Sequence, residues 1–295
     1  MKNLPYTGLA ISLAFVIFAV AGICEQDHAE TEIPFRLVNG NLIVVSLESG
    51  EDGPFNFVLD TGADTTIVDS SLAARLSLPS LRPVQQTTLA GVRILNRSLV
   101  PALSVGTAEV HNLPVLVEDL ASLRQLDSHI QGIAGQDFLS HFNYLLDYRR
   151  RVLRIEAASE IENALQGDRV RIEAGGNRMI VASEGQSLRR ANLRLLLDSG
   201  ASSVVLIRSG SQALDVPAFE SVQEATTSGN VNLRTGHVRT LSIGSERLHD
   251  ISVALSAAEP AEPIGDGLLP TGLFQTLYVN NRDGFVVFNP RVKKN

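Results

Sequence analysis

The stretch Phe57-Val58-Leu59-Asp60-Thr61-Gly62-Ala63-Asp64-Thr65-Thr66 occurs in this chain a second time in closely similar form. The second copy, Leu195-Leu196-Leu197-Asp198-Ser199-Gly200-Ala201-Ser202-Ser203-Val204, follows 138 residues later. In each copy, a run of apolar residues leads directly into Asp-Thr/Ser-Gly-Ala. Consecutive apolar residues are typical of a strand buried on both faces, and the Gly permits a tight turn after it. The pattern therefore predicts, twice, a carboxylate at the end of a rigid buried strand.

Two carboxylates brought together from related halves have a specific chemistry. They share one proton, because like charges that close cannot both ionise easily. The ionised member can take a proton from water, and the protonated member can polarise a carbonyl group. A single Asp-Thr-Gly is interpreted as a turn with an Asx hydrogen bond, but two copies behind apolar strands are not. We therefore expect Asp60 and Asp198 to be a catalytic pair that needs no metal and no cofactor.

Composition and charge narrow the class of protein. The 295 residues are 44% hydrophobic, which is enough material for two compact domains. The net charge is −7, and the one basic block, Arg149-Arg150-Arg151, lies between two apolar runs, as at a hairpin tip. Nucleic acid is therefore not an expected partner. The six His show no zinc-binding spacing, and the absence of Trp argues against a carbohydrate-stacking surface.

The first 23 residues have the pattern of a targeting segment. Lys2 precedes an apolar run over residues 9–23, which is shorter than the roughly 20 residues needed to span a bilayer. Small residues at Ala19-Val20-Ala21 favour a cleaved signal peptide, with an uncleaved membrane anchor as the alternative. Either predicts an extracytoplasmic protein, periplasmic or secreted. Cys24 is the only cysteine, so no intrachain disulfide can form, and Ile23 before it argues against a lipoprotein.

Further blocks repeat in the same order in both halves. Leu241-Ser242-Ile243-Gly244 corresponds to Leu103-Ser104-Val105-Gly106, and Gly267-Leu268-Leu269-Pro270 corresponds to Gly132-Ile133-Ala134-Gly135. This internal duplication predicts two lobes, over residues 33–156 and 169–290, joined by a polar linker. Within the first lobe we expect a short helix capped at Asp69, and separate strands at residues 92–95 and 103–106.

With these blocks in place, each half resembles a retropepsin-type lobe of the aspartic proteases. The shared order is Asp-Thr/Ser-Gly, a flap hairpin, and then a strand of two apolar residues and Gly that enters a short helix. The resemblance covers residues 33–290. It implies an all-β acid-protease fold with two pseudo-twofold-related β-barrel lobes and short helices. It also implies an aspartic endopeptidase that acts on peptide or protein substrates as a monomer with both lobes in one chain.

The resemblance also implies roles for individual residues. Asp60 and Asp198 would be the catalytic dyad, and Thr61 and Ser199 would hydrogen-bond across the lobe interface. Gly62 and Gly200 would let the substrate backbone lie close to the dyad. The remaining active-site loop residues are Ala63 and Ala201, and the expected substrate-binding residues are Asp64, Ala90, Gly91, Ser202 and Gly229.

The sequence departs from the family pattern at three places. Retroviral enzymes carry Arg where this chain has Gln136, and the second lobe has Pro270 in place of the motif Gly. Pro cannot donate a backbone hydrogen bond, so local geometry there should differ. Neither expected flap contains the Tyr of pepsin-like enzymes.

Two further expectations follow. Ala63 and Ala201 offer no hydroxyl to lower a carboxyl pKa, so we expect an activity optimum less acidic than pepsin's; a profile peaking below about pH 3 would contradict this. The competing hypotheses are a catalytically weak peptide-binding or scaffold protein with the same fold, and a chain that dimerises and uses one motif pair.

Overall fold

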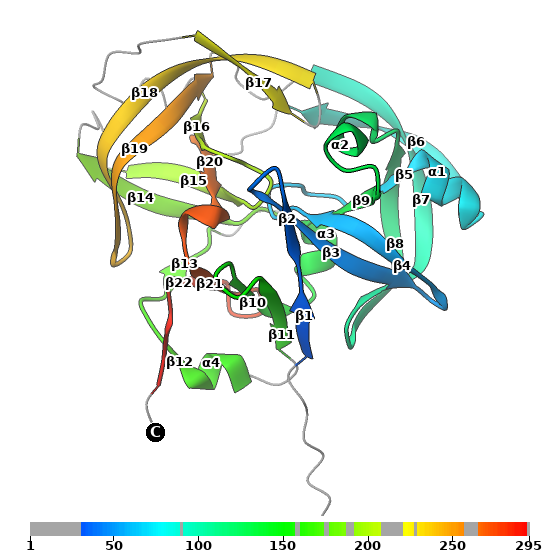
Figure 1. The fold of residues 1–295 in the computed structure, drawn as a ribbon, viewed down its shortest axis with the longest axis horizontal. Helices are drawn as coiled ribbons and strands as arrows, with labels where there is room; N and C mark the ends of the chain where they lie inside the picture. Colours follow the sequence, from blue (N-terminus) through cyan, green and yellow to red (C-terminus); the bar gives the residue numbers. More distant parts are fainter. Residues whose placement is uncertain are drawn as a thin grey trace, which may run out of the picture.

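The structure is a computed structural model, and it describes residues 31–88, 91–156, 160–173, 177–186, 192–207, 221–226, 229–256 and 265–293. The predicted targeting segment and Cys24 lie outside these residues. Within the described ranges, no helix has the length and apolar character needed to cross a membrane. The fold is all-β with a few short helices, as predicted (Figure 1).

The first lobe is an eight-stranded sheet in the order β2-β3-β4-β9-β5-β8-β7-β6, with an additional pairing of β3 with β7 that brings the sheet round on itself. The first-motif strand β4 lies between β3 and β9, and it runs parallel to β9. Phe57 and Leu59 of this strand are buried in the core of the lobe. The strands are β2 (Arg36–Val38), β3 (Leu42–Ser49), β4 (Asp52–Leu59), β5 (Ile67–Asp69), β6 (Ser80–Thr88), β7 (Gly91–Val105), β8 (Ala108–Glu118) and β9 (Ile130–Ala134).

The second lobe repeats this plan with seven strands in the order β14-β15-β20-β16-β19-β18-β17, and β14 also pairs with β18. The second-motif strand β15 lies between β14 and β20 and runs parallel to β20, just as β4 runs parallel to β9. The strands are β14 (Ile180–Gln186), β15 (Asn192–Asp198), β16 (Val204–Leu206), β17 (Ser221–Thr226), β18 (Gly229–Ile243), β19 (Glu246–Ser256) and β20 (Gly267–Pro270).

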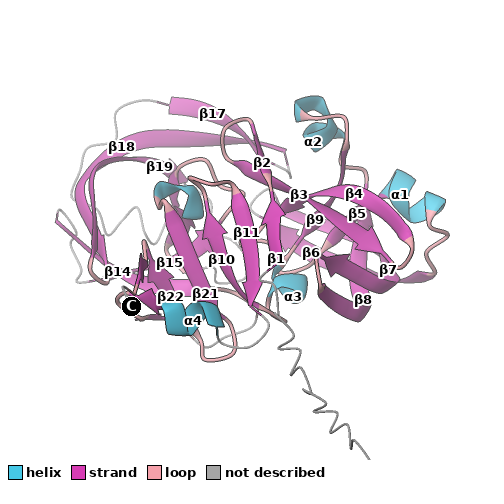
Figure 2. Ribbon diagram, turned by 60° about the horizontal axis from the view of Figure 1, so that its bottom comes forward, coloured by secondary structure: helices cyan, strands magenta, loops and turns pink. Residues whose placement is uncertain are grey.

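A six-stranded sheet joins the lobes. Its order, β1-β11-β10-β21-β22-β13, places three strands of the first lobe beside three of the second, in mirrored sequence about the β10–β21 pair (Figure 2). In Figure 1 this sheet lies below the two lobe sheets, with helix α4 beneath it. The elements are β1 (Thr31–Pro34), β10 (Asn143–Asp147), β11 (Val152–Glu156), β13 (Val170–Arg171), β21 (Thr276–Asn280), β22 (Phe285–Phe288) and α4 (Glu160–Ala164), beside the short pair β12 (Leu165–Gln166) and β23 (Arg291–Val292).

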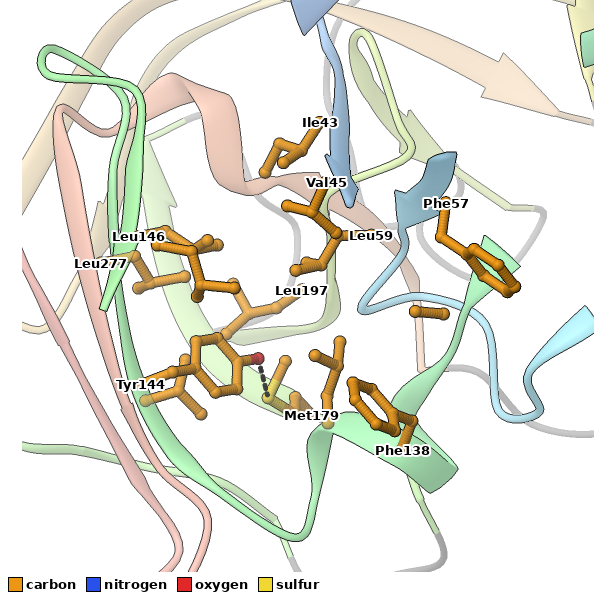
Figure 3. Close-up of a cluster of buried hydrophobic side chains, with 14 of the residues drawn as sticks. Ile43, Val45, Phe57, Leu59, Phe138, Tyr144, Leu146, Met179, Leu197 and Leu277 are labelled. Carbon is orange, nitrogen blue, oxygen red and sulfur yellow. Dashed lines mark hydrogen bonds between the residues drawn. The ribbon is translucent and has the colours of Figure 1, made fainter. Parts of the chain in front are cut away.

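The hydrophobic core runs through both lobes without interruption. Leu59 and Leu197, the residues just before the two aspartates, belong to the same buried cluster as Leu146 and Leu277 of the joining sheet (Figure 3). Separating the lobes would expose these side chains to water, at about 25 cal/mol per Å² of apolar surface. The two halves of the site are thus held together by shared packing.

The remaining helices are short. Helix α1 (Ser70–Arg75) begins after Asp69, whose carboxylate accepts from the backbone N–H of Ser71, so the predicted cap is confirmed. The others are α2 (Ala121–Leu126), α3 (Gln136–Leu139) and the 3₁₀ turn η1 (Thr271–Leu273). The prediction of separate strands at 92–95 and 103–106 was wrong, because β7 is one strand of 15 residues. It pairs with β6 at its start and with β8 up to its end, so hydrogen bonds to these neighbours continue through the polar residues in the middle of the strand.

Candidate active site

Each motif aspartate stands at the end of its buried strand. The N–H of Asp60 donates to the carbonyl of Ala134 at 2.9 Å, and Asp198 lies in register with Pro270 on the parallel neighbour β20. The backbone that carries each aspartate is therefore fixed by the sheet of its own lobe. Both aspartates keep a partly exposed surface, so they remain accessible from outside.

The residues after the aspartates bind the two lobes to each other. The N–H of Thr61 donates to Ser199 Oγ at 3.0 Å, and the N–H of Ser199 donates to Thr61 Oγ1 at 3.0 Å. Each hydroxyl then donates to the strand of the other lobe, Thr61 to the carbonyl of Leu197 at 2.9 Å and Ser199 to that of Leu59 at 2.7 Å. All four bonds are buried. They set the two aspartate loops in one relative position.

The motif glycines are required by the opposite carboxylate. A Cβ atom at Gly62 would lie 2.5 Å from Cγ of Asp198, and one at Gly200 would lie 3.0 Å from Oδ2 of Asp60. The resemblance explained these glycines by the approach of a substrate backbone. The structure adds a reason that holds even without a substrate, because any side chain at Gly62 would displace the carboxyl group of the other lobe.

Burial and mutual repulsion shape the titration of the pair. Burial and the nearby charge of Asp60 raise the pKa of Asp198 well above its usual range. Burial also raises the pKa of Asp60, opposed by hydrogen bonds from the N–H of Gly62 and from the Asp198 carboxyl group. The two carboxyl groups are thus within hydrogen-bonding reach, and together they retain a proton at pH values where an isolated Asp is ionised.

A comparison with known protein families agrees with this geometry. The family model described as aspartyl protease matches the chain twice, over residues 45–138 and 182–273. The chain belongs to the aspartyl protease family. Each match contains one of the two aspartate motifs, which confirms the duplication predicted from the sequence. No curated protein matches the chain.

In the first lobe of this aspartyl protease family member, a polar network supports the aspartate loop. Asp137 Oδ1 accepts from the N–H of Thr66 at 2.8 Å and from its hydroxyl at 2.6 Å, and Thr66 Oγ1 accepts from the N–H of Gly135 at 3.1 Å. Burial raises the pKa of Asp137. Sequence analysis did not identify this network, although it singled out the repeated block that ends at Gly135 and the departure at Gln136 beside it.

The corresponding positions of the second lobe carry no such network. Val204, Pro270 and Gly272 stand where the first lobe has Thr66, Gly135 and Asp137. The hydroxyl, the backbone donor and the carboxylate acceptor are replaced together, so none of the three is left buried without its partner. The change of geometry expected at Pro270 is present, because β20 enters a 3₁₀ turn instead of the α-helix that follows β9.

Beneath the dyad, each hairpin of the joining sheet contacts the opposite lobe. Tyr148 follows β10, and its hydroxyl lies 2.5 Å from Thr271 Oγ1. Asn281 follows β21 at the corresponding position, and its Oδ1 accepts from Gln136 Nε2 at 3.1 Å. Gln136, noted as a departure from the retroviral pattern, therefore has a partner across the interface.

The lobes also meet at the ends of the two motifs, in different ways. Asp64 is held by Arg178 of the second lobe, whose Nε lies 3.0 Å from both carboxylate oxygens. On the other side, the Asn41 side-chain amide donates to the carbonyl of Gly200 at 3.2 Å, and Ser202, the counterpart of Asp64, is exposed. Arg178 follows no motif, so nothing in the sequence marked it.

The two expected flaps are hairpins. Gly91 pairs with Thr88 at the end of β6–β7, and Gly229 pairs with Thr226 at the end of β17–β18. Ala90 and the other tip residues lie outside the described residues. In the part of the chain that the structure describes, no cluster of three His, Cys, Asp or Glu side chains could hold a metal ion.

Proposed function

We propose that this protein is an aspartic endopeptidase whose single active site is built from Asp60 and Asp198, one from each lobe. The observation that carries the proposal is the reciprocal set of bonds between Thr61 and Ser199, which brings the two carboxyl groups within reach of one proton. A water molecule bound between two such carboxyl groups can be activated without a nucleophilic side chain.

The roles of the two aspartates follow from their surroundings. Asp60 acts as the base, because its pKa is raised less than that of Asp198 and because it accepts a hydrogen bond from the Asp198 carboxyl group. Asp198 carries the shared proton, because the charge of Asp60 favours its neutral form. Asp60 takes a proton from the water as its oxygen attacks the peptide carbonyl, and Asp198 donates its proton to the carbonyl oxygen. Asp60 then passes its proton to the amide nitrogen, one hydroxyl of the tetrahedral intermediate returns a proton to Asp198, and the C–N bond breaks to release the two peptide products.

The same surroundings support a mildly acidic optimum. The side chains of Ala63 and Ala201 are methyl groups, so at these positions only backbone donors face the carboxylates, as with the N–H of Ala201 at 3.0 Å from Asp198 Oδ1. Both aspartates have raised pKa values, so the acid limb of the rate profile should lie above that of a dyad stabilised by additional hydroxyl donors.

We also propose that the protease works outside the cytoplasm, on the basis of the apolar run over residues 9–23. Fractionation of the producing cells, with the mass of the mature protein, tests this. A full-length protein in the cytoplasm would contradict it.

The experiment that tests the function is cleavage of a mixed peptide library across pH by the purified protein, beside Asp60→Asn and Asp198→Asn. Glu109→Gln, at an exposed carboxylate of β8, is the control for loss of a negative charge. Activity lost in both Asn variants and kept in the control would support one shared dyad. Loss in only one variant would mean that the lobes do not share a site. A folded wild type that binds peptides without cleaving them would favour the peptide-binding alternative.

A further inference from the structure

The second aspartate loop lacks the polar support that the first one has. Under Asp60, the Asp137 carboxylate ties Thr66 to the strand end at Gly135. Under Asp198 this support is missing, because the corresponding residues are Val204, Pro270 and Gly272. Yet both carboxyl groups must be held with similar accuracy to share one proton. The Thr61–Ser199 bonds and the bond from Asn41 to Gly200 hold the loop itself, so a further contact beneath Asp198 must take the place of this network.

Tyr148 occupies the place where such a contact is needed. Its ring carbon Cε1 lies 3.7 Å from the position that a Cβ atom of Gly272 would take, so the ring packs beside the place that corresponds to the start of the Asp137 side chain in the first lobe. Its hydroxyl lies 2.5 Å from Oγ1 of Thr271, which is completely buried. Thr271 directly follows Pro270, the residue in register with Asp198.

The position of Tyr148 is itself well fixed. Its N–H donates to the carbonyl of Gln275 at 2.9 Å, and its ring packs edge-to-face against Phe35 at a centroid distance of 5.9 Å. Burial and the charge of Asp198 raise the pKa of Tyr148 to about 12, so the hydroxyl stays neutral at any pH at which the protein works and keeps its hydrogen bond to Thr271. Asn281, at the corresponding position of the other hairpin, has no ring and leaves the Asp137 network undisturbed.

We propose that Tyr148 is a positioning residue for catalysis: reaching across from the first lobe, it replaces the missing polar network and holds the Asp198 loop through Thr271. This inference rests on the proposed function in its catalytic consequence, but its structural part can be tested without activity. The dyad is thus supported on both sides by residues of the first lobe, Asp137 under Asp60 and Tyr148 under Asp198.

Amide hydrogen exchange of the whole protein tests the structural part. Tyr148→Phe keeps the ring and removes the hydroxyl, and Thr271→Val removes its partner. We expect both to speed exchange in residues 198–202 and 267–274 by several-fold, and to leave residues 60–66 unchanged. Gln136→Leu, which breaks the corresponding bond on the other side, is the matched control and should leave 198–202 unchanged. Equal effects on both loops, or none, would overturn the proposal.

Kinetics test the catalytic part. Loss of one buried hydrogen bond should lower kcat of Tyr148→Phe by up to roughly tenfold, with KM nearly constant, because substrate contacts are untouched. A changed KM at constant kcat would overturn the positioning role. If the wild type cleaves no peptide, the proposed function fails alone, and hydrogen exchange still decides the structural claim.

A rescue variant tests the equivalence of the two supports. In the Tyr148→Phe background, Val204→Thr, Pro270→Gly and Gly272→Asp rebuild the network of the first lobe in the second. We expect exchange in residues 198–202 to return towards the wild-type rate. A folded variant with no such recovery would overturn the equivalence. If the triple change prevents folding, agreement between Tyr148→Phe and Thr271→Val in exchange still carries the test.

Discussion

The two lobes are alike in the layer that carries the aspartates and different in the layer beneath it. In the upper layer, Thr61 and Ser199 make the same pair of bonds in opposite directions. In the lower layer, the first lobe has the Asp137 network and the second has apolar residues with Tyr148 against them. The comparison teaches that the two lobes keep the same hydrogen bonds where their carboxyl groups must meet. Beneath the aspartates the lobes can differ, because different contacts can hold each loop in place.

The lower layer also shows how a buried polar network can be lost at little cost. Removing one member leaves a buried donor or acceptor without its partner, at roughly 1–3 kcal/mol for each group. Replacing Thr, Gly and Asp together by Val, Pro and Gly removes the hydroxyl, the Gly N–H and the carboxylate at once, so none of these three groups is left without its partner. The changes at Val204, Pro270 and Gly272 therefore act together, and they exchange one set of contacts for another.

The largest effect that tests the comparison is expected in the upper layer. Thr61→Val removes the acceptor for Ser199 N–H and the donor to Leu197, so two buried backbone groups lose their partners. We expect roughly 2–6 kcal/mol of lost unfolding free energy in urea, together with loss of cleavage. Ser199→Ala should behave in the same way. If one variant is harmless and the other severe, the upper layer is not symmetric as described.

The lower layer should respond in one lobe only. Asp137→Leu takes the acceptor from both donors of Thr66, and we expect it to lower the unfolding free energy by about 2–4 kcal/mol. Asp137→Asn should cost less, because its amide oxygen still accepts. Gly272→Ala, at the matching place in the second lobe, should be nearly neutral, because the nearest atom to the new Cβ is 3.7 Å away. Equal losses in urea unfolding would contradict the difference between the lobes.

The two aspartates should differ in how much each lowers the stability of the folded protein at neutral pH. A carboxyl whose pKa is raised in the folded state contributes stability below its unfolded pKa, and this is lost as pH rises through the folded pKa. At pH 7 Asp198 therefore carries the larger penalty. We expect Asp198→Asn to raise Tm at pH 7 more than Asp60→Asn does, at about 2–4 °C per kcal/mol, and to have less effect at pH 3. Calorimetry at the two pH values checks this; no stabilisation at pH 7 would count against a buried, proton-sharing pair.

The smallest effect concerns the cross-lobe ion pair. The charge of Asp64 raises the pKa of Asp60, and Arg178 offsets that charge. Arg178→Gln should therefore move the acid limb of the rate profile to higher pH by a few tenths of a unit, with less effect at high salt. Arg169→Gln, an ion pair of the linker region, is the control. A limb that moves to lower pH would show that Asp64 does not act on the dyad in this way.

Much of the upper layer could be predicted from the sequence, because it depends on local patterns. An apolar run into Asp-Thr/Ser-Gly specifies a buried strand, a turn and a carboxylate, and its repetition specifies the second lobe. The lower layer could not, because Tyr148 and Thr271 are 123 residues apart and belong to no motif. Arg178 also belongs to no motif and could not be predicted either. The sequence marks Pro270 as a departure from the family pattern. The contact between Tyr148 and Thr271 depends on packing between the lobes, which cannot be read from one sequence.

The central claim is that two lobes build one dyad with one shared proton. It is tested most directly by NMR titration of the protein with ¹³C-labelled Asp carboxyl groups, in the wild type and in Asp60→Asn. The account predicts that the wild type shows one carboxyl titrating well above the usual range, and that this pKa falls when the charge of Asp60 is removed. An Asp198 resonance that titrates at the same pH in both proteins would contradict it.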